Sequence, residues 1–206
     1  MHVATYPLGP LQTNSYLIAN GQAALAVDCG GDPGPMLARI NSRGLALSHV
    51  ILTHLHCDHI YGAAALAKAT GAVVLAAEQD RPLLQTELGS GGFMGLPLVD
   101  PFEFLDLPAG ETTFLGLACR VLATPGHTPG SRSLYFPEAA ALFSGDLLFR
   151  RSIGRTDFPL GDHEALLRSV REQIFSLPRE TVVYSGHGPE TTVGEEREHN
   201  PFFVDY

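Results

Sequence analysis

Short apolar runs separated by turn-forming residues open the chain and predict strands and helices in alternation. Residues 16–19 and 24–27 are apolar and flank Asn20-Gly21, a dipeptide that favours the tight turn of a β-hairpin. Apolar residues then repeat with helical spacing between Asp32-Pro33 and Gly44. An aspartate before a proline is typical of a helix start and a glycine of a helix end, so we expect a helix there with Asp32 as its N-cap.

Further apolar runs, bounded by glycine, proline or polar clusters, continue along the chain. They predict strands at residues 50–52, 72–75, 114–122, 133–136, 141–144 and, as the last of the series, 181–184. Alanine-rich residues 63–69, ended by Gly71, predict a helix. A last long helix is expected from an N-cap at Asp162, with Leu167, Val170 and Ile174 on one face.

A glycine-rich stretch without charge, residues 88–97, interrupts this pattern. An ordinary mobile loop is the simpler interpretation; a flap that covers a substrate, with Phe93 and Met94 as its apolar tip, is the alternative. No proline- or serine-rich linker and no repeat divides the chain. The alternation of strands and helices therefore predicts one α/β domain over residues 1–206.

Composition narrows the class of protein. Apolar types make up 45% of the 206 residues and charged types 17%, which excludes an intrinsically disordered chain. The formal net charge of −9 disfavours binding to nucleic-acid phosphates, and no apolar run reaches the roughly 18 residues of a membrane-spanning helix. Cysteines are few and the N-terminus lacks the build of a secretion signal, so we expect a cytoplasmic protein without nucleic-acid or membrane partners.

The chemically informative segment is H-x-H-x-D-H, which holds His54, His56, Asp58 and His59 within six residues. So many imidazole and carboxylate groups are costly to bury without a partner, and a metal ion is one such partner. In an extended chain, residues i and i+2 point the same way, so His54 and His56 can converge on one ion. Where the chain turns into a helix, Asp58 and His59 point elsewhere. The four side chains therefore suit two adjacent ions better than one.

Three further candidate ligands follow predicted strands and stand beside glycines: His127 in TPGH, Asp146 in SGD and His187 in SGH. Glycine lets the backbone approach closely or adopt a positive φ, which helps a loop at a strand end to aim a side chain. Together with the motif, these residues make five histidines and two aspartates, enough donors for two metal sites. Paired ions commonly share a bridging carboxylate and a bridging water or hydroxide.

These segments resemble the metallo-β-lactamase superfamily in type and in order, over residues 9–202. The resemblance implies an α/β fold, a four-layered αβ/βα sandwich with the metals at one edge of the two sheets. It also implies the ligand roles: a first ion on His54, His56 and His127, a second on Asp58, His59 and His187, and Asp146 as the bridge. Two divalent ions are expected, zinc in the first place, with iron or manganese as alternatives.

Within the superfamily the chain is most similar to short glyoxalase II-type hydrolases, through TPGHTPGS at residues 124–131, IGRTDF at 153–158 and GHGPETT at 186–192. Full-length glyoxalase II has an added C-terminal helical domain that binds glutathione. The sequence stops 19 residues after His187, so we expect that domain to be absent. β-Lactamases of the commonest subclass carry cysteine where Asp146 stands, so β-lactamase activity is not expected.

The function predicted from these residues is metal-dependent hydrolysis of a small-molecule thioester such as a 2-hydroxyacyl-glutathione. A hydroxide that bridges the two ions attacks the acyl carbonyl, and Asp58 and Asp146 hold that hydroxide by hydrogen bonds. Arg155 and Asp157 are candidates to anchor the substrate or to orient a ligand imidazole, and an ordinary surface ion pair is the alternative.

The three cysteines are interpreted mainly as packing residues. Cys57 stands between two candidate ligands and could supply a thiolate to the metal site. Its direction, opposite His56 in an extended chain, favours a packed small residue instead. We expect Cys29 and Cys119 to be buried and inert.

Two other functions stay open. One is a persulfide dioxygenase, whose subfamily shows a similar GRTDF segment and H-x-H-x-D-H stretch and would hold one ferrous ion on His56, His127 and Asp146. The other is a non-catalytic module that binds metal or docks a partner. A metal count near two ions per chain favours the hydrolase over the dioxygenase.

Overall fold

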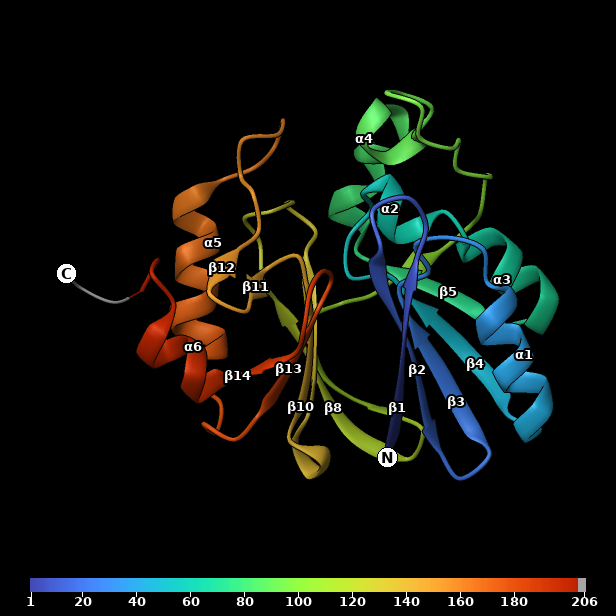
Figure 1. Ribbon diagram of the computed structural model, residues 1–206, viewed down its shortest axis with the longest axis horizontal. Helices are drawn as coiled ribbons and strands as arrows, with labels where there is room; N and C mark the ends of the chain where they lie inside the picture. The colour runs from blue at the N-terminus through green and yellow to red at the C-terminus, as the bar shows by residue number, and fades with distance from the viewer. Residues whose placement is uncertain (204–206) are drawn as a thin grey trace. The chain divides into compact units, whose positions relative to one another are not determined.

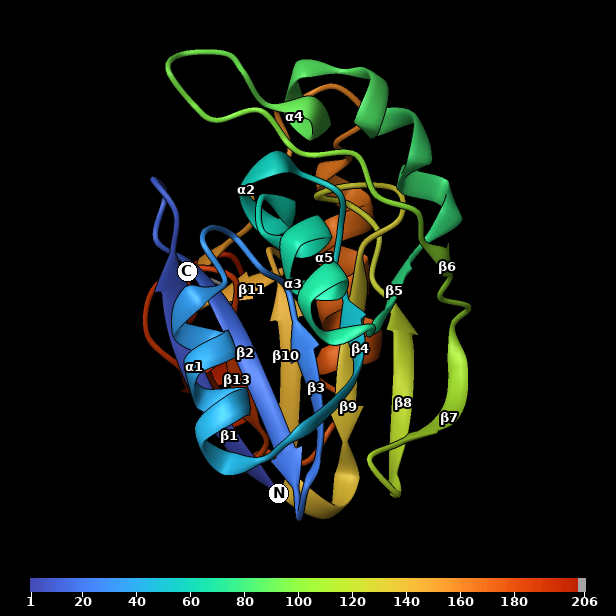
Figure 2. The ribbon, with the colours of Figure 1, turned by 90° about the vertical axis from the view of Figure 1, so that its right-hand side faces the viewer.

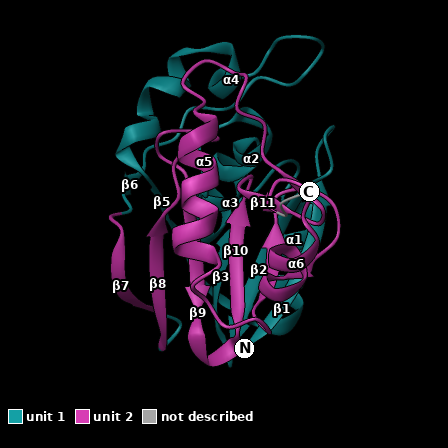
Figure 3. Cartoon of the chain, turned by 90° about the vertical axis from the view of Figure 1, so that its left-hand side faces the viewer, with its two compact units in different colours: residues 1–107, 114–116 teal, residues 108–113, 117–206 magenta. Residues whose placement is uncertain are grey.

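A computed structural model of the protein describes residues 1–203, which form two compact units (Figure 1). The first unit holds residues 1–107 and 114–116, and the second holds residues 108–113 and the described chain from 117 onward (Figure 3). The prediction of a single domain stays a prediction. Over the described residues, no helix is long and apolar enough to span a bilayer.

The first unit is built on a six-stranded sheet whose strands follow their order in the sequence. The strands are β1 (His2–Leu8), β2 (Thr13–Asn20), β3 (Ala23–Val27), β4 (Ala46–Ile51), β5 (Val73–Ala76) and β6 (Leu105–Asp106). The first three are antiparallel, and β3 to β6 are parallel. The predicted hairpin at Asn20-Gly21 is confirmed as β2 and β3. Strand β1 was not predicted, because most of its residues are not buried and it shows no apolar run.

Helices α1 (Gly34–Arg43) and α3 (Ala63–Thr70) cover one face of this sheet (Figure 2). Met36 and Ile40 of α1 and Leu66 of α3 join one apolar cluster with Val50 and Val74 of the strands. Three short helices complete the unit: α2 (Cys57–Ile60), the 3₁₀ helix η1 (Glu78–Gln85) and α4 (Glu87–Ser90). Burial of the apolar helix faces against the sheet stabilises the unit.

Both predicted helices of this unit are confirmed, but the N-cap of the first helix and the extent of the predicted loop at 88–97 differ from the prediction. Pro33, not Asp32, is the N-cap of α1, while the Asp32 carboxylate accepts a hydrogen bond from the Gly34 N–H (3.0 Å). The predicted loop at 88–97 begins inside α4, so only its later part is irregular. Met94 in that part is 92% exposed.

The second sheet has the order β14-β13-β10-β9-β8-β7. Its strands are β7 (Gly110–Phe114), β8 (Leu117–Ala123), β9 (Arg132–Phe136), β10 (Ala141–Gly145), β13 (Val182–Ser185) and β14 (Thr191–Thr192). Strand β10 is parallel to β13 and antiparallel to β9, so the sheet is mixed. The short strands β11 (Leu148–Phe149) and β12 (Ser152–Ile153) form a separate hairpin after β10.

Helix α5 (His163–Ser169) continues as a π-helical turn, η3 (Val170–Ile174), and packs on this sheet (Figure 3). Asp162 caps it as predicted, because its carboxylate accepts a hydrogen bond from the Ala165 N–H (2.9 Å). Val170 and Ile174 are fully buried against strand residues such as Leu142. The unit also contains the 3₁₀ turn η2 (Pro137–Ala139) and α6 (Val193–His199).

Two predictions for this region were wrong. The strand expected over 114–122 is broken at Leu115-Gly116, where both residues have positive φ (57° and 73°) and separate β7 from β8. The strand at 181–184 is not the last, because β14 pairs with it and α6 follows. Both later elements escape a hydrophobicity pattern, since β14 has two threonines and α6 is mostly charged.

Candidate metal centre

The four clustered ligand candidates lie where β4 ends and the chain turns into α2. His56 is the extended N-cap of α2 (ψ 143°), so the chain becomes helical between His56 and Cys57. His54, His56 and His59 are buried, and the Asp58 side chain is 13% exposed. The prediction that Asp58 and His59 point away from His54 and His56 depended on this turn into a helix.

A buried carboxylate beneath the turn orients two of these imidazoles. Asp28 follows β3 with a φ of 58° and accepts hydrogen bonds from the Thr53 N–H, the Thr53 hydroxyl and His59 Nδ1, each at 2.8 Å. Because a carboxylate can only accept, His59 carries its proton on Nδ1 and turns the lone pair of Nε2 toward the candidate site. The Thr53 oxygen gives its proton to Asp28 and accepts from His54 Nδ1 (3.1 Å), which orients His54 in the same way.

Two further contacts support the turn from other parts of the first unit. Thr13 of β2 donates a hydrogen bond from its hydroxyl to the Asp58 carboxylate (3.0 Å). The Leu55 N–H donates to the carboxylate of Asp80, which is completely buried (3.2 Å). Thr13, Asp28, Thr53 and Asp80 were not predicted as site residues. The one signal in the sequence was the position of Asp28 and Thr53 directly after apolar strand runs.

The other three candidates follow separate strands of the second sheet: His127 after β8, Asp146 after β10 and His187 after β13. Asp146 Oδ2 lies 3.7 Å from His127 Nε2 and 3.6 Å from His187 Nε2. Both distances are too long for good hydrogen bonds. They fit ligand atoms that face a shared cation lying about 2 Å from each atom. The Asp146 side chain is only 12% exposed.

Glycine supports two of these ligands as predicted. Gly126, before His127, has a φ of 141°, and Gly145, before Asp146, has a φ of 52°. A Cβ at Gly126 would lie 2.3 Å from the Leu166 backbone nitrogen in α5, so no other residue fits there. His127 Nδ1 donates to the backbone carbonyl of Arg155 (2.7 Å), which leaves its Nε2 for an ion.

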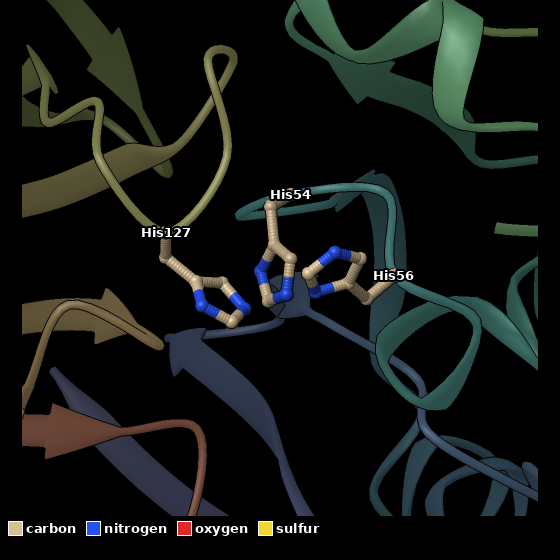
Figure 4. A group of neighbouring side chains, drawn as sticks. All are labelled: His54, His56 and His127. Atoms are coloured by element: carbon tan, nitrogen blue, oxygen red, sulfur yellow. The ribbon is translucent and has the colours of Figure 1, made fainter. Parts of the chain in front are cut away.

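The seven candidates form three groups of three residues, some shared between groups. In each group the ligand atoms lie within 4.8 Å of one another. The groups are His54, His56 and His127 (Figure 4); His54, His59 and Asp146; and Asp58, His59 and His187. Neutral imidazoles and carboxylates in such numbers are the donors that zinc, iron and manganese take in proteins. The residues present therefore fit divalent metal ions.

Arg155 and Asp157 form a two-pronged ion pair, with both nitrogen–oxygen distances at 2.8 Å. The hydrogen bond from Arg155 lowers the pKa of Asp157. Their side chains are 54% and 70% exposed, and the Arg155 guanidinium also lies 3.7 Å from the centre of the Phe158 ring. Arg155 reaches a candidate ligand through its backbone carbonyl, whereas its side chain makes the surface pair that the sequence left as an alternative.

The cysteines are buried free thiols, as expected. Burial raises the pKa of Cys57, whose sulfur accepts a hydrogen bond from the Tyr61 hydroxyl (3.3 Å). Burial also raises the pKa of Cys29 and of Cys119 to about 12. A neutral thiol is a poor nucleophile, and none of the three cysteines belongs to the groups of candidate metal ligands found among the described residues, which supports packing roles.

Curated relatives cover nearly the whole chain. The chain is 37% identical over 199 residues to the probable metallo-hydrolase YqgX of Bacillus subtilis, covering 95% of this chain and 94% of that protein. It is 35% identical over 211 residues to the hydroxyacylglutathione hydrolase GloC of Haemophilus influenzae, with 98% of both chains covered.

Solved structures confirm the predicted fold. A crystal structure of the BLEG-1 B3 metallo-β-lactamase matches with a TM-score of 0.92 and 39% identity, covering 99% of this chain and 100% of that one. The structure of TTHA1623 in a di-iron-bound form matches with a TM-score of 0.87 and 40% identity, covering 98% and 100%. A family model described as the metallo-β-lactamase superfamily matches residues 8–187, which include every candidate ligand. The chain therefore belongs to the metallo-β-lactamase superfamily.

Proposed function

We propose that this member of a metallo-hydrolase superfamily is a binuclear hydrolase that cleaves thioesters of the 2-hydroxyacyl-glutathione type. The observation that carries the proposal is the gathering of all seven candidate ligands, four from one turn and three from separate strand ends, into groups with ligand atoms within 4.8 Å. Two relatives support it. GloC is named a hydroxyacylglutathione hydrolase, and the TTHA1623 structure is described as di-iron-bound.

The three groups correspond to the proposed ligand roles. His54, His56 and His127 form the first ion site, and Asp58, His59 and His187 form the second. Asp146 groups with His54 of the first site and His59 of the second, which supports its role as the bridge. Zinc, iron and manganese all suit this donor set.

When bound, the ions supply Lewis acidity and lower the pKa of a coordinated water, so that a nucleophile exists at neutral pH. The chain's own residues orient that reaction. Asp58, steadied by Thr13, and Asp146 accept hydrogen bonds from the nucleophile and aim it at the acyl carbon. A thiolate is a stable leaving group, so the site needs no strong general acid.

The test is a metal count paired with an assay on S-lactoylglutathione. We expect about two ions per chain. Chelation is expected to abolish hydrolysis, and Zn²⁺, Mn²⁺ or Fe²⁺ to restore it. His187→Ala is expected to lower kcat/KM by at least about 100-fold, as removal of a ligand to a catalytic metal does. His199→Ala is the matched control, because His199 is 56% exposed and belongs to none of the ligand groups.

Other outcomes identify the alternatives. One iron per chain, with O₂ consumption and no thioester hydrolysis, points to a persulfide dioxygenase. Metal without turnover of any thioester, ester or lactone points to a binding module. Hydrolysis unchanged after complete metal removal contradicts the proposal altogether.

β-Lactam hydrolysis is the second candidate, favoured by the likeness to the BLEG-1 B3 metallo-β-lactamase. A chromogenic cephalosporin assayed beside the thioester decides between them. The proposal requires a higher kcat/KM for the thioester.

A further inference from the structure

A buried carboxylate on α6 lies at the centre of a hydrogen-bonded group that the metal centre does not include. Glu196 has no exposed surface. Its Oε1 accepts from Arg151 Nη1 (2.9 Å) and the Thr191 hydroxyl (2.6 Å), and its Oε2 accepts from the Arg151 N–H (2.8 Å) and Asn200 Nδ2 (2.9 Å). Four donors fill the acceptor capacity of a carboxylate. We call Arg151, Thr191, Glu196 and Asn200 the α6 clamp.

The clamp fastens the hairpin of β11 and β12. Arg151 lies in the turn of this hairpin with a φ of 61°, a conformation that non-glycine residues rarely adopt. Both its N–H and its guanidinium are held by Glu196. Asn200 Nδ2 also donates its second N–H to the Ser152 carbonyl (3.0 Å), so strand β12 is tied to the end of α6, and the Phe149 carbonyl of β11 lies 3.5 Å from the same nitrogen.

The segment 149–155, which contains most of this hairpin, contacts each candidate ligand of the second unit. The Phe149 ring packs edge-on against the His187 ring with centroids 6.2 Å apart. Gly154 lies so close to Asp146 that a Cβ there would be 1.8 Å from the Asp146 carbonyl oxygen. The Arg155 carbonyl accepts the hydrogen bond from His127 Nδ1.

We propose that Glu196 is a positioning residue for the metal centre: through Arg151 and Asn200 it fixes segment 149–155, and that segment sets the places of His127, Asp146 and His187. The inference rests on the proposed metal centre. Its physical basis is that ligands held by a rigid support lose little freedom when an ion binds, so loosening the support weakens the binding.

The test is Glu196→Gln, which keeps the shape of the side chain but replaces one acceptor oxygen by an NH₂ facing donors of Arg151 or Asn200. Zn²⁺ affinity is measured by competition with a chromophoric chelator. The melting temperature is measured with and without Zn²⁺. We expect affinity to fall by about tenfold, the lower end for residues that support metal ligands. The increase in melting temperature that Zn²⁺ produces is then expected to be smaller than in wild type. If Glu196 had a purely structural role, the variant would melt lower without Zn²⁺, but the increase on adding Zn²⁺ would be the same as in wild type.

The matched control is Glu195→Gln. Glu195 binds the same guanidinium through Arg151 Nη2 (2.8 Å), but its side chain is 55% exposed, so Zn²⁺ affinity is expected to stay within twofold of wild type. If Glu196→Gln does not fold, Thr191→Val removes a single hydrogen bond to Glu196 and is expected to weaken Zn²⁺ binding by a smaller factor in the same direction.

The outcomes separate this inference from the proposed function. Wild-type protein that binds no metal and hydrolyses no thioester overturns both. Wild-type protein that binds metal and hydrolyses the thioester, with unchanged Zn²⁺ affinity in the folded clamp variants, overturns only the role of Glu196.

Discussion

The two sets of candidate ligands are held in different ways. In the first unit, four ligands lie on one turn, and side chains orient them: Asp28 holds His59 directly and His54 through Thr53. In the second unit, three ligands lie on three strand ends. Backbone supports two of them, through the carbonyl of Arg155 for His127 and the close approach of Gly154 for Asp146.

The difference shows that a metal ligand can be oriented by residues that are recognisable in the sequence or by residues that are not. A carboxylate that orients an imidazole must be Asp or Glu, so its identity marks its role. A backbone carbonyl belongs to every residue, so the residue that carries it need not look special. The comparison predicts that side-chain changes damage the first set, while the second set is damaged by changes that move the backbone.

The largest effect is expected from Asp28→Asn. An amide places an NH₂ group against at least one of the three donors that now meet the carboxylate, and each hydrogen bond to a charged group contributes about 1.5–3 kcal/mol. Chemical denaturation of the metal-free protein measures this loss, and Zn²⁺ binding is expected to weaken as well. Asp32→Asn is the control, since Asp32 is exposed at the start of α1. An unchanged unfolding midpoint in Asp28→Asn contradicts the central role of this carboxylate.

Gly154→Ala is expected to have the next largest effect, and it tests the backbone support in the second unit. Its Cβ would lie 1.8 Å from a backbone oxygen, so the chain must shift, at a cost of about 1–3 kcal/mol. The shift moves Asp146, and both stability and Zn²⁺ affinity are expected to fall. Gly34→Ala is the matched control, because its Cβ meets only the Asp32 side chain at 3.3 Å. Wild-type affinity in Gly154→Ala would mean that this close contact does not position Asp146.

The smallest effects come from a pair of variants that compares the two kinds of support directly. Thr53→Val removes the hydroxyl between Asp28 and His54 and is expected to cost about 1–2 kcal/mol, with Zn²⁺ affinity lowered about 10–100-fold. Arg155→Ala keeps the carbonyl that holds His127 and loses an exposed ion pair and the contact of the guanidinium with the Phe158 ring. Its cost is expected to stay near or below about 1 kcal/mol, with unchanged Zn²⁺ affinity.

Denaturation and chelator competition on both proteins provide the measurement. An equal loss of Zn²⁺ affinity in the two variants would remove the distinction between side-chain and backbone support.

Local signals in the sequence determined several elements and the ligand candidates. Asn20-Gly21 set the hairpin of β2 and β3, Gly44 and Gly71 ended two helices in the left-handed conformation, and Asp162 capped α5. The motif from His54 to His59 was readable because its ligands are contiguous and of rare types. The superfamily resemblance then supplied the order of the remaining ligands.

Only the tertiary structure decided what holds those ligands. Asp28 meets His59 across 31 positions and Arg151 meets Glu196 across 45, and neither pairing follows from local pattern. Strand β14 exists because two threonines find a partner in β13, and His127 is oriented by a carbonyl that any residue could supply. Periodicity and turn chemistry act over a few residues, whereas these contacts join segments that only folding brings together.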